Sequence, residues 1–130
     1  MKTETFLFDG VEYAIKIGKC REENDALVRS SLPTDVWFHL ANVPSCHVVV
    51  SGSSETRQLP KVTAHGADNR QFLKELPKQV IKRCACLCIA HSKPASKKNI
   101  PVSYTPIANL INTSVLGQVQ IVGQCKTIII

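Results

Sequence analysis

The feature that most constrains the fold is an alternation of apolar and polar side chains around an Asp-Gly pair. The pair is Asp9-Gly10, and this dipeptide favours a two-residue hairpin turn because both central positions need positive φ. If Phe8 pairs with Val11, the apolar side chains of this segment share one face: Phe6, Phe8, Val11, Tyr13, Ile15 and Ile17. Residues 6–17 are therefore predicted to form an antiparallel hairpin with one buried face.

A second hairpin is predicted over residues 35–50. Its turn is expected at residues 41–45, which carry the Asn and Pro that turns favour. Because successive side chains of a strand point to opposite faces, Val36, Phe38 and Leu40 are expected to lie together on one side.

The other side of this second hairpin is predicted to carry three ring side chains. If the turn is centred on Val43, His39 pairs with His47, and Trp37 lies opposite Val49 on the same face. Direct cross-strand partners have Cβ atoms about 4.5–5.5 Å apart. One indole and two imidazoles are therefore expected to form a patch on the surface of the sheet.

Two helices are predicted between the strands. A short one covers residues 22–29, after Gly18 ends the preceding strand. Pro77 opens a second helix, at a position where its missing N–H costs nothing. The apolar residues that follow recur with helical spacing and are expected to form its buried stripe: Val80, Ile81, Cys84, Leu87, Cys88 and His91.

The end of the chain is predicted to add three strands, at residues 101–105, 118–122 and 126–130. Residues 51–70 show no periodicity and are predicted to be an inserted surface loop. Residues 1–130 are thus expected to form a single α+β domain, with an antiparallel-dominated sheet of hairpins and a long amphipathic helix packed on one face.

Charge is distributed unevenly along the chain. Residues 1–70 hold eight basic and nine acidic side chains, whereas residues 71–130 hold eight basic side chains and one acidic. Seven of the basic residues fall between positions 74 and 98. A surplus of this kind either serves solubility or binds a polyanion, and its concentration in one half favours the polyanion.

The sequence also bears on the compartment of the protein. No segment approaches the roughly 18–20 apolar residues that cross a bilayer, so no membrane partner is expected. The first residues do not resemble a secretory signal, and the six cysteines are therefore expected to be reduced thiols. A cytoplasmic location is predicted, and a nuclear one is equally allowed.

Three interpretations of the ring patch remain open at this stage. It could be a nucleic-acid surface, because an indole stacks on a base and imidazoles stack or donate to phosphate. It could hold a metal ion between His39 and His47, although Asp35 lies about 13 Å away along the strand and no third ligand is evident. It could also be structural, with Trp37 and both histidines inside the core.

Other motifs give no evidence of catalysis. Cys84, Cys86 and Cys88 resemble a ligand cluster, but Cys86 points away from the other two on a helix, and buried thiols behave as small apolar groups. There is no nucleophile elbow and no phosphate-binding glycine loop. The chain is therefore predicted not to be an enzyme, and no cofactor is expected.

Two segments of the second hairpin resemble the NFACT-R domain family, also called DUF814. Residues 35–39 read Asp-Val-Trp-Phe-His and residues 44–50 read Pro-Ser-Cys-His-Val-Val-Val. The family pattern is an Asp-x-Trp-Phe/Leu-His strand, a short turn with Pro-Gly-Ser, and His-Val; this chain has Ser45-Cys46 where many members have Gly-Ser. Further similar segments cover nearly the whole chain outside 51–70: Gly18-Lys19, 23–27, 76–80, 102–106 and 117–119.

The resemblance implies an RNA-binding module and no settled catalytic activity. In larger members the same domain is part of ribosome-associated quality-control factors that engage stalled large ribosomal subunits and tRNA. The implied partners are therefore tRNA or rRNA, the large ribosomal subunit included, and proteins of translation.

The resulting hypothesis assigns roles to nine residues. Trp37, His39 and His47 form the contact patch and Asn24 and Asp35 shape it, while four lysines hold phosphates: Lys19, Lys93, Lys97 and Lys98. The carboxylate of Asp35 is expected to accept hydrogen bonds that fix the preceding loop. The alternative hypothesis is a protein-interaction adaptor that docks on the ribosome or on translation factors without contacting RNA. A metal-dependent hydrolase that uses His39 and His47 is a third.

Overall fold

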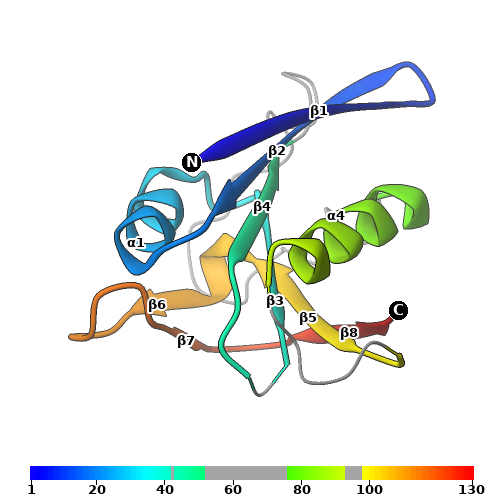
Figure 1. Ribbon diagram of the computed structural model, residues 1–130. Coiled ribbons are helices and arrows are strands. Elements are labelled where there is room, and N and C mark those ends of the chain that lie inside the picture. Colours follow the sequence, from blue (N-terminus) through cyan, green and yellow to red (C-terminus); the bar gives the residue numbers. More distant parts are fainter. Residues whose placement is uncertain (42, 52–75, 93–97) are drawn as a thin grey trace.

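A six-stranded antiparallel sheet forms the centre of the protein (Figure 1). The computed structural model describes residues 1–41, 43–51, 76–92 and 98–130. The strand order is β1-β2-β4-β3-β5-β8. The strands are β1 (Lys2–Phe8), β2 (Val11–Gly18), β3 (Val36–Leu40), β4 (His47–Ser51), β5 (Pro101–Pro106) and β8 (Lys126–Ile129).

The two predicted hairpins are confirmed with their registers. Phe8 pairs with Val11, and the turn residues Asp9 and Gly10 have φ of 52° and 77°, as a two-residue turn of this kind requires. In the second hairpin Trp37 pairs with Val49. The second hairpin lies inside the sheet, because β4 also pairs with β2 and β3 also pairs with β5.

Two helices cover opposite faces of this sheet (Figure 1). Helix α1 spans Arg21–Ser30, close to the predicted 22–29, and helix α4 spans Lys78–Ala90 directly after Pro77. Because both faces are covered, all five residues of β4 are buried. This explains why β4 reads as a continuous apolar run instead of an alternating one.

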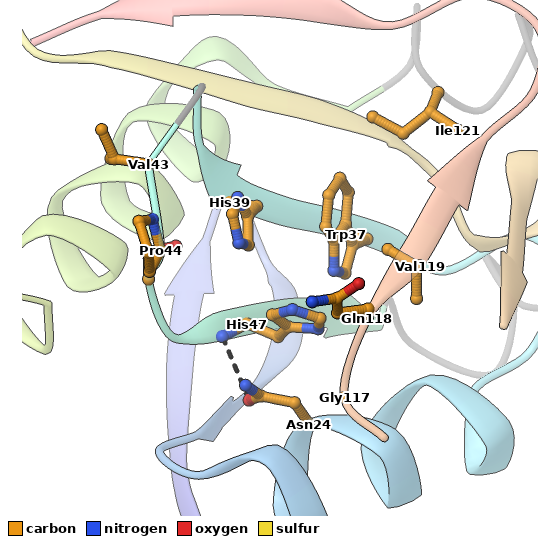
Figure 2. A pocket seen from close by; sticks show the side chains of 11 residues that line it. Asn24, Trp37, His39, Val43, Pro44, His47, Gly117, Gln118, Val119 and Ile121 are labelled. Atoms are coloured by element: carbon orange, nitrogen blue, oxygen red, sulfur yellow. Dashed lines mark hydrogen bonds between the residues drawn. The ribbon is translucent and has the colours of Figure 1, made fainter. Parts of the chain in front are cut away.

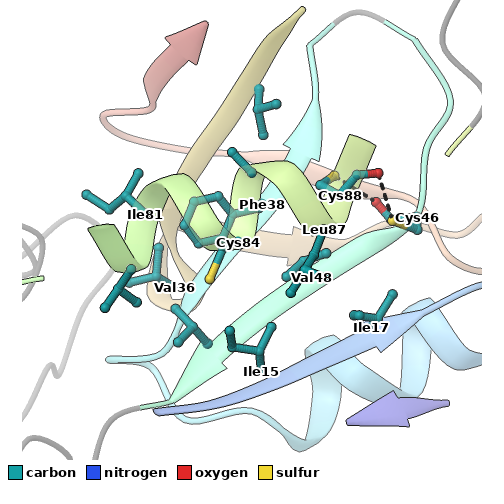
Figure 3. Packing of buried hydrophobic residues seen from close by; sticks show 14 of the residues in the cluster. Ile15, Ile17, Val36, Phe38, Cys46, Val48, Ile81, Cys84, Leu87 and Cys88 are labelled. Carbon is teal, nitrogen blue, oxygen red and sulfur yellow. Dashed lines mark hydrogen bonds between the residues drawn. The ribbon is translucent and has the colours of Figure 1, made fainter. Parts of the chain in front are cut away.

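The larger core lies between the sheet and α4 (Figure 3). Phe38 is fully buried at its centre, together with alternate residues of β2, β3 and β4. The helix contributes Cys84 and Cys88, both fully buried, whereas Cys86 is half-exposed. The interpretation of the cysteine triplet as core packing is therefore confirmed, and burial raises the pKa of the Cys84 thiol.

The smaller core lies on the other face, under α1. Leu27 and Val28 of α1 pack there against Trp37 and Val49 of the sheet. A second, two-stranded sheet of β6 (Leu110–Asn112) and β7 (Val119–Ile121) extends this side of the molecule, after a 3-10 turn at Ile107–Asn109. Leu110 and Val119 of these strands join the smaller core.

The structure corrects three expectations about the elements. Helix α4 has 13 residues, an ordinary length for globular proteins, so the long helix is not confirmed. His91 caps its end and is half-exposed instead of lying in the buried stripe. The strand predicted at 118–122 pairs with β6, an element not predicted, and stands outside the main sheet. Most of the loop predicted at 51–70 lies outside the described residues.

The lengths of the helices also decide whether one of them could cross a membrane. Among the described residues, no helix is both long enough and apolar enough to span a lipid bilayer.

Replacement of Ile15 tests how much the larger core contributes to the free energy of unfolding. Ile15 is fully buried, so Ile15→Ala should lower the free energy of unfolding by about 2–5 kcal/mol, through lost apolar transfer and the cavity it leaves. The matched control is Ile129→Ala, because Ile129 is 64% exposed on an edge strand. We expect a cost below about 1 kcal/mol for the control. Urea denaturation measures both, and equal losses would contradict this description of the core.

Candidate functional site

The three predicted ring side chains lie in mutual contact on the α1 side of the sheet (Figure 2). The Trp37 and His39 rings stack with centroids 5.3 Å apart and an interplanar angle of 15°. His47 meets both rings edge-on, at 5.5 Å from Trp37 and 5.1 Å from His39. The sequence thus predicted correctly that these side chains gather on one face.

Their exposure differs from the prediction. Trp37 and His47 are each only 3% exposed, and His39 is half-buried, so the rings do not project into solvent as a surface patch. Helix α1 and the strand β7 cover the face on which they lie. The structural interpretation therefore describes the packing of Trp37 and His47. The rings still line an opening, and their role as a nucleic-acid surface stays a prediction.

That opening is a pocket of about 420 Å³. Its floor is the three rings, and its walls come from α1, from the turn between β3 and β4, and from β7 (Figure 2). The volume is within the range of small-molecule sites in proteins. The lining residues beyond the rings are Asn24, Val43, Pro44, Ser45, Gly117, Gln118, Val119 and Ile121.

Two ring nitrogen atoms of this floor are buried without a hydrogen bond. Trp37 Nε1 and His47 Nδ1 have no partner among the described residues. Buried polar groups are nearly always hydrogen-bonded, and leaving one unpaired costs about 1–3 kcal/mol. Both atoms have almost no exposed surface, so a bound molecule reaches them only when a lining side chain, such as that of Gln118, moves aside.

The histidines are held in the neutral form. Burial lowers the pKa of His47 to about 3, with a further contribution from His39. Burial also lowers the pKa of His39, although its hydrogen bond to a backbone carbonyl opposes this. That bond joins His39 Nδ1 to the Leu40 oxygen at 2.6 Å. Because a carbonyl only accepts, the proton of neutral His39 is on Nδ1 and its Nε2 is an acceptor.

Asn24 links helix α1 to the strand that carries His47. The backbone N–H of His47 donates to Asn24 Oδ1 at 3.3 Å. The close approach depends on Gly18, which pairs with His47: a Cβ at Gly18 would lie 2.5 Å from that same Asn24 oxygen. Gly18 and Asn24 of the sequence motif thus have a shared structural reason.

Asp35 does not line the pocket. It is 2% exposed and accepts a hydrogen bond from the backbone N–H of Leu32 at 2.9 Å. Its backbone carbonyl also accepts from the N–H of Ile107 at 2.8 Å. Asp35 therefore holds the loop that leads into β3, which is the local role expected from the sequence. It affects the pocket only by positioning that strand.

The predicted lysines are only partly placed. Lys19 is exposed and follows Gly18, the residue paired with His47. Lys98 is exposed just before β5, whose Pro101 carbonyl accepts from Ala41 N–H at the turn beside the pocket. Both therefore lie at the pocket end of the sheet. Lys93 and Lys97 lie outside the described residues.

The basic residues of α4 do not continue this group. Lys78 and Lys82 are exposed on the helix that covers the opposite face of the sheet from the pocket. Arg83 pairs with Glu4 at 3.1 Å. In the part that the structure describes, Lys78, Lys82 and Arg83 lie on α4 and Lys98 lies just before β5, so residues 74–98 do not form a continuous track of charge beside the pocket.

A metal site finds no support in the described ranges. They contain no group of three or more His, Cys, Asp or Glu side chains placed to hold an ion. The Nδ1 of His39 is engaged with a carbonyl, which leaves one nitrogen of that ring for any ligand.

The sequence did not indicate the wall formed by residues 117–121. No spacing relates this segment to Trp37, which precedes it by 80 positions, and only the docking of β7 under α1 brings them together. One residue of the sequence, Gly117, was a signal of this close packing. Its φ is +80°, and a Cβ there would lie 2.7 Å from the Cα of Arg21, so the turn can pass the start of α1 only as glycine.

The chain is similar to a known protein family and to several known proteins. The family model described as "NFACT protein RNA binding domain" matches residues 3–127. Coiled-coil domain-containing protein 25 of Mus musculus is 33% identical over 103 residues, which are 78% of this chain and 42% of that protein. Its counterpart in Bos taurus is 32% identical with the same coverage. The chain thus spans less than half the length of these relatives.

A solved structure supports the fold as well. The C-terminal part of the fibronectin/fibrinogen-binding protein from Streptococcus suis superposes with a TM-score of 0.69 at 22% identity, covering 100% of this chain and 45% of that one. Residues 35–39, 76–80 and 104–106 resemble in particular the small eukaryotic coiled-coil domain-containing protein 25 group, and the relatives found at about 30% identity confirm that resemblance.

The buried neutral histidine predicts a dependence of stability on pH. The unfolded chain binds a proton at this ring below its ordinary pKa of 6.5, whereas the folded chain does so only near pKa 3. The contribution is thus fully present above pH 6.5 and is lost as the pH falls through this window. Loss of this contribution should make the free energy of unfolding about 2 kcal/mol lower at pH 5 than at pH 7.

Urea denaturation at several pH values measures this dependence. In His47→Gln the decline from pH 7 to pH 5 should be clearly smaller, and the remainder should come from His39 and His91, whose pKa values are also lowered. His91→Gln is the control: burial and the nearby Lys19 and Lys2 lower the pKa of this ring, but it is half-exposed, so the variant should keep most of the decline of the original chain. Identical slopes in all three proteins would show that His47 is not held neutral by the fold.

Proposed function

The chain belongs to the family of NFACT protein RNA-binding domains, and on that premise we propose that it binds tRNA or rRNA through the pocket face of the sheet. The observation that carries this proposal is the ring-floored pocket with two unpartnered nitrogen atoms. It lies at the end of the sheet where exposed Lys19 and Lys98 supply positive charge. A pocket with polar atoms inside and lysine side chains near its edge fits a single-stranded RNA, which presents both bases and phosphates.

The division of labour within this surface follows from charge. Phosphates stay in solvent and are met by lysine side chains, which position RNA without reading its sequence. The four lysines assigned to this role are Lys19, Lys93, Lys97 and Lys98. Discrimination among RNAs then rests with the pocket, where single-stranded or looped segments present their bases.

We propose binding without catalysis. The described lining of the pocket has no carboxylate and no thiol, and both imidazoles are neutral, one of them bonded to a carbonyl. A paired general acid and base would need groups whose pKa values are pushed apart. An RNA partner in translation, the large ribosomal subunit included, further leads us to propose a cytoplasmic site of action.

A specific observation also favours the adaptor hypothesis. The hairpin of β6 and β7 exposes four large apolar side chains, at 38–51% of their surface: Ile111, Val115, Leu116 and Ile121. Exposed apolar groups gathered on one hairpin mark protein contacts. We propose a protein partner on the ribosome or among translation factors as the second candidate. RNase treatment of the native complex separates the two candidates, because only the adaptor's complex resists it.

Lysine variants test the RNA-binding proposal. Lys19→Ala with Lys98→Ala should weaken binding of tRNA or rRNA fragments and make the plot of log K against log salt shallower by roughly one to two units, since two phosphate contacts are lost. Fluorescence anisotropy over a salt series measures both effects.

The matched control uses two lysines of helix α4, which covers the opposite face of the sheet from the pocket. Lys78→Ala with Lys82→Ala removes the same charge from α4 and should leave the slope of the original chain unchanged. If the two double variants lose affinity equally, the interaction is general attraction to a basic protein and the pocket face is not the site.

A further inference from the structure

The pocket is more selective than a phosphate-binding surface would be. No lysine or arginine is among its described lining residues, and its walls are partly apolar, with Pro44 and Val119 on opposite sides (Figure 2). A phosphate taken into such a place would lose its hydration without meeting a cation, which costs far more than burying a neutral polar group. The occupant should therefore be neutral.

The polar atoms of the pocket are of both kinds. Trp37 Nε1–H is a donor, and indole has no acceptor to offer. His39 Nε2 is an acceptor, because its Nδ1 proton is fixed by the Leu40 carbonyl. Gln118, whose amide lies beside Trp37 and His47 in Figure 2, brings one donor and one acceptor. A phosphate presents acceptors only, so it would be repelled by half of this set.

An unpaired nucleobase matches these requirements. It is planar and neutral, and its edge alternates donors and acceptors. Proteins that take up single bases read this edge with hydrogen bonds and pack the ring faces against apolar or aromatic side chains. The buried nitrogen atoms of Trp37 and His47, each on a side chain only 3% exposed, would gain their missing partners from such an edge once the exposed Gln118 side chain moves aside.

We propose that this pocket receives one unpaired RNA base, inserted edge-first against Trp37 Nε1 and His47 Nδ1, while the attached phosphates stay outside. This rests on the RNA-binding function proposed above and adds which part of the RNA enters the protein. The base is chosen by its hydrogen-bonding edge, and the backbone contributes only outside the pocket.

The single Trp of the chain makes the test direct. In a ¹⁵N-labelled sample, Trp37 gives one indole N–H resonance, which moves when an acceptor reaches Nε1. We expect saturable movement of this resonance with at least one of adenosine, guanosine, cytidine and uridine, at millimolar concentration. Ribose 5-phosphate and inorganic phosphate should leave it in place. Movement by phosphate, or by no nucleoside at all, would overturn the proposal.

An experiment with oligonucleotides distinguishes this inference from the proposed RNA-binding function on which it rests. A single-stranded RNA of ten nucleotides should bind and move the indole resonance, whereas an abasic chain of equal length should bind more weakly and leave the resonance in place. RNA that binds without moving the resonance would overturn the base pocket and leave RNA binding intact. RNA that does not bind at all, beside a nucleoside that does, would overturn RNA binding alone.

A pair of glutamine variants gives the matched control. Gln118 directly precedes β7 and lines the pocket, whereas Gln120 within β7 does not; both side chains are exposed. Gln118→Ala should weaken nucleoside binding about three- to tenfold, the usual effect of one lost hydrogen bond, and Gln120→Ala should leave it unchanged. Equal effects of the two variants, whether large or absent, would overturn this placement of the base.

Discussion

The pairing of β3 between β4 and β5 is the constraint on which the rest of the structure depends. Strand β3 has neighbours on both edges and a covered face on both sides, so each of its side chains has a fixed destination. Phe38 points to α4 and completes the larger core, while Trp37 points to α1 and floors the pocket. A slip of one residue would exchange these two sets, so core and pocket are specified together.

The stability of the pocket is linked to its chemistry through burial. Covering Trp37 and His47 gains apolar contact under α1, yet it leaves two ring nitrogen atoms unpaired and keeps an imidazole neutral. Among the described residues, the protein tolerates this cost where α1, the β3–β4 turn and β7 meet around an opening. A bound group that satisfies these nitrogen atoms would gain free energy that solvent-exposed rings could not supply, because in water they already have partners.

The turn between β3 and β4 shows how a departure from the family pattern is accommodated. Ser45 stands where the resemblance to the NFACT-R pattern implies glycine in many members, and its hydroxyl accepts from Leu40 N–H at 3.0 Å while donating to the Cys46 carbonyl at 2.8 Å. The serine therefore closes the turn with its own side chain and remains on the pocket wall. Cys46 turns instead to the helix side, where its thiol donates to the Cys88 carbonyl at 3.4 Å.

The sequence by itself determined the two hairpins, their registers, both main helices and the gathering of Trp37, His39 and His47. These follow from period-two alternation, an Asp-Gly turn and helical spacing, all of which are local in the chain. Only the tertiary structure decided that the rings are buried, that residues 117–121 wall the pocket, and that the α4 lysines face away from it. The reason is physical: exposure depends on which distant segment docks on a face, and no periodicity within one strand records that.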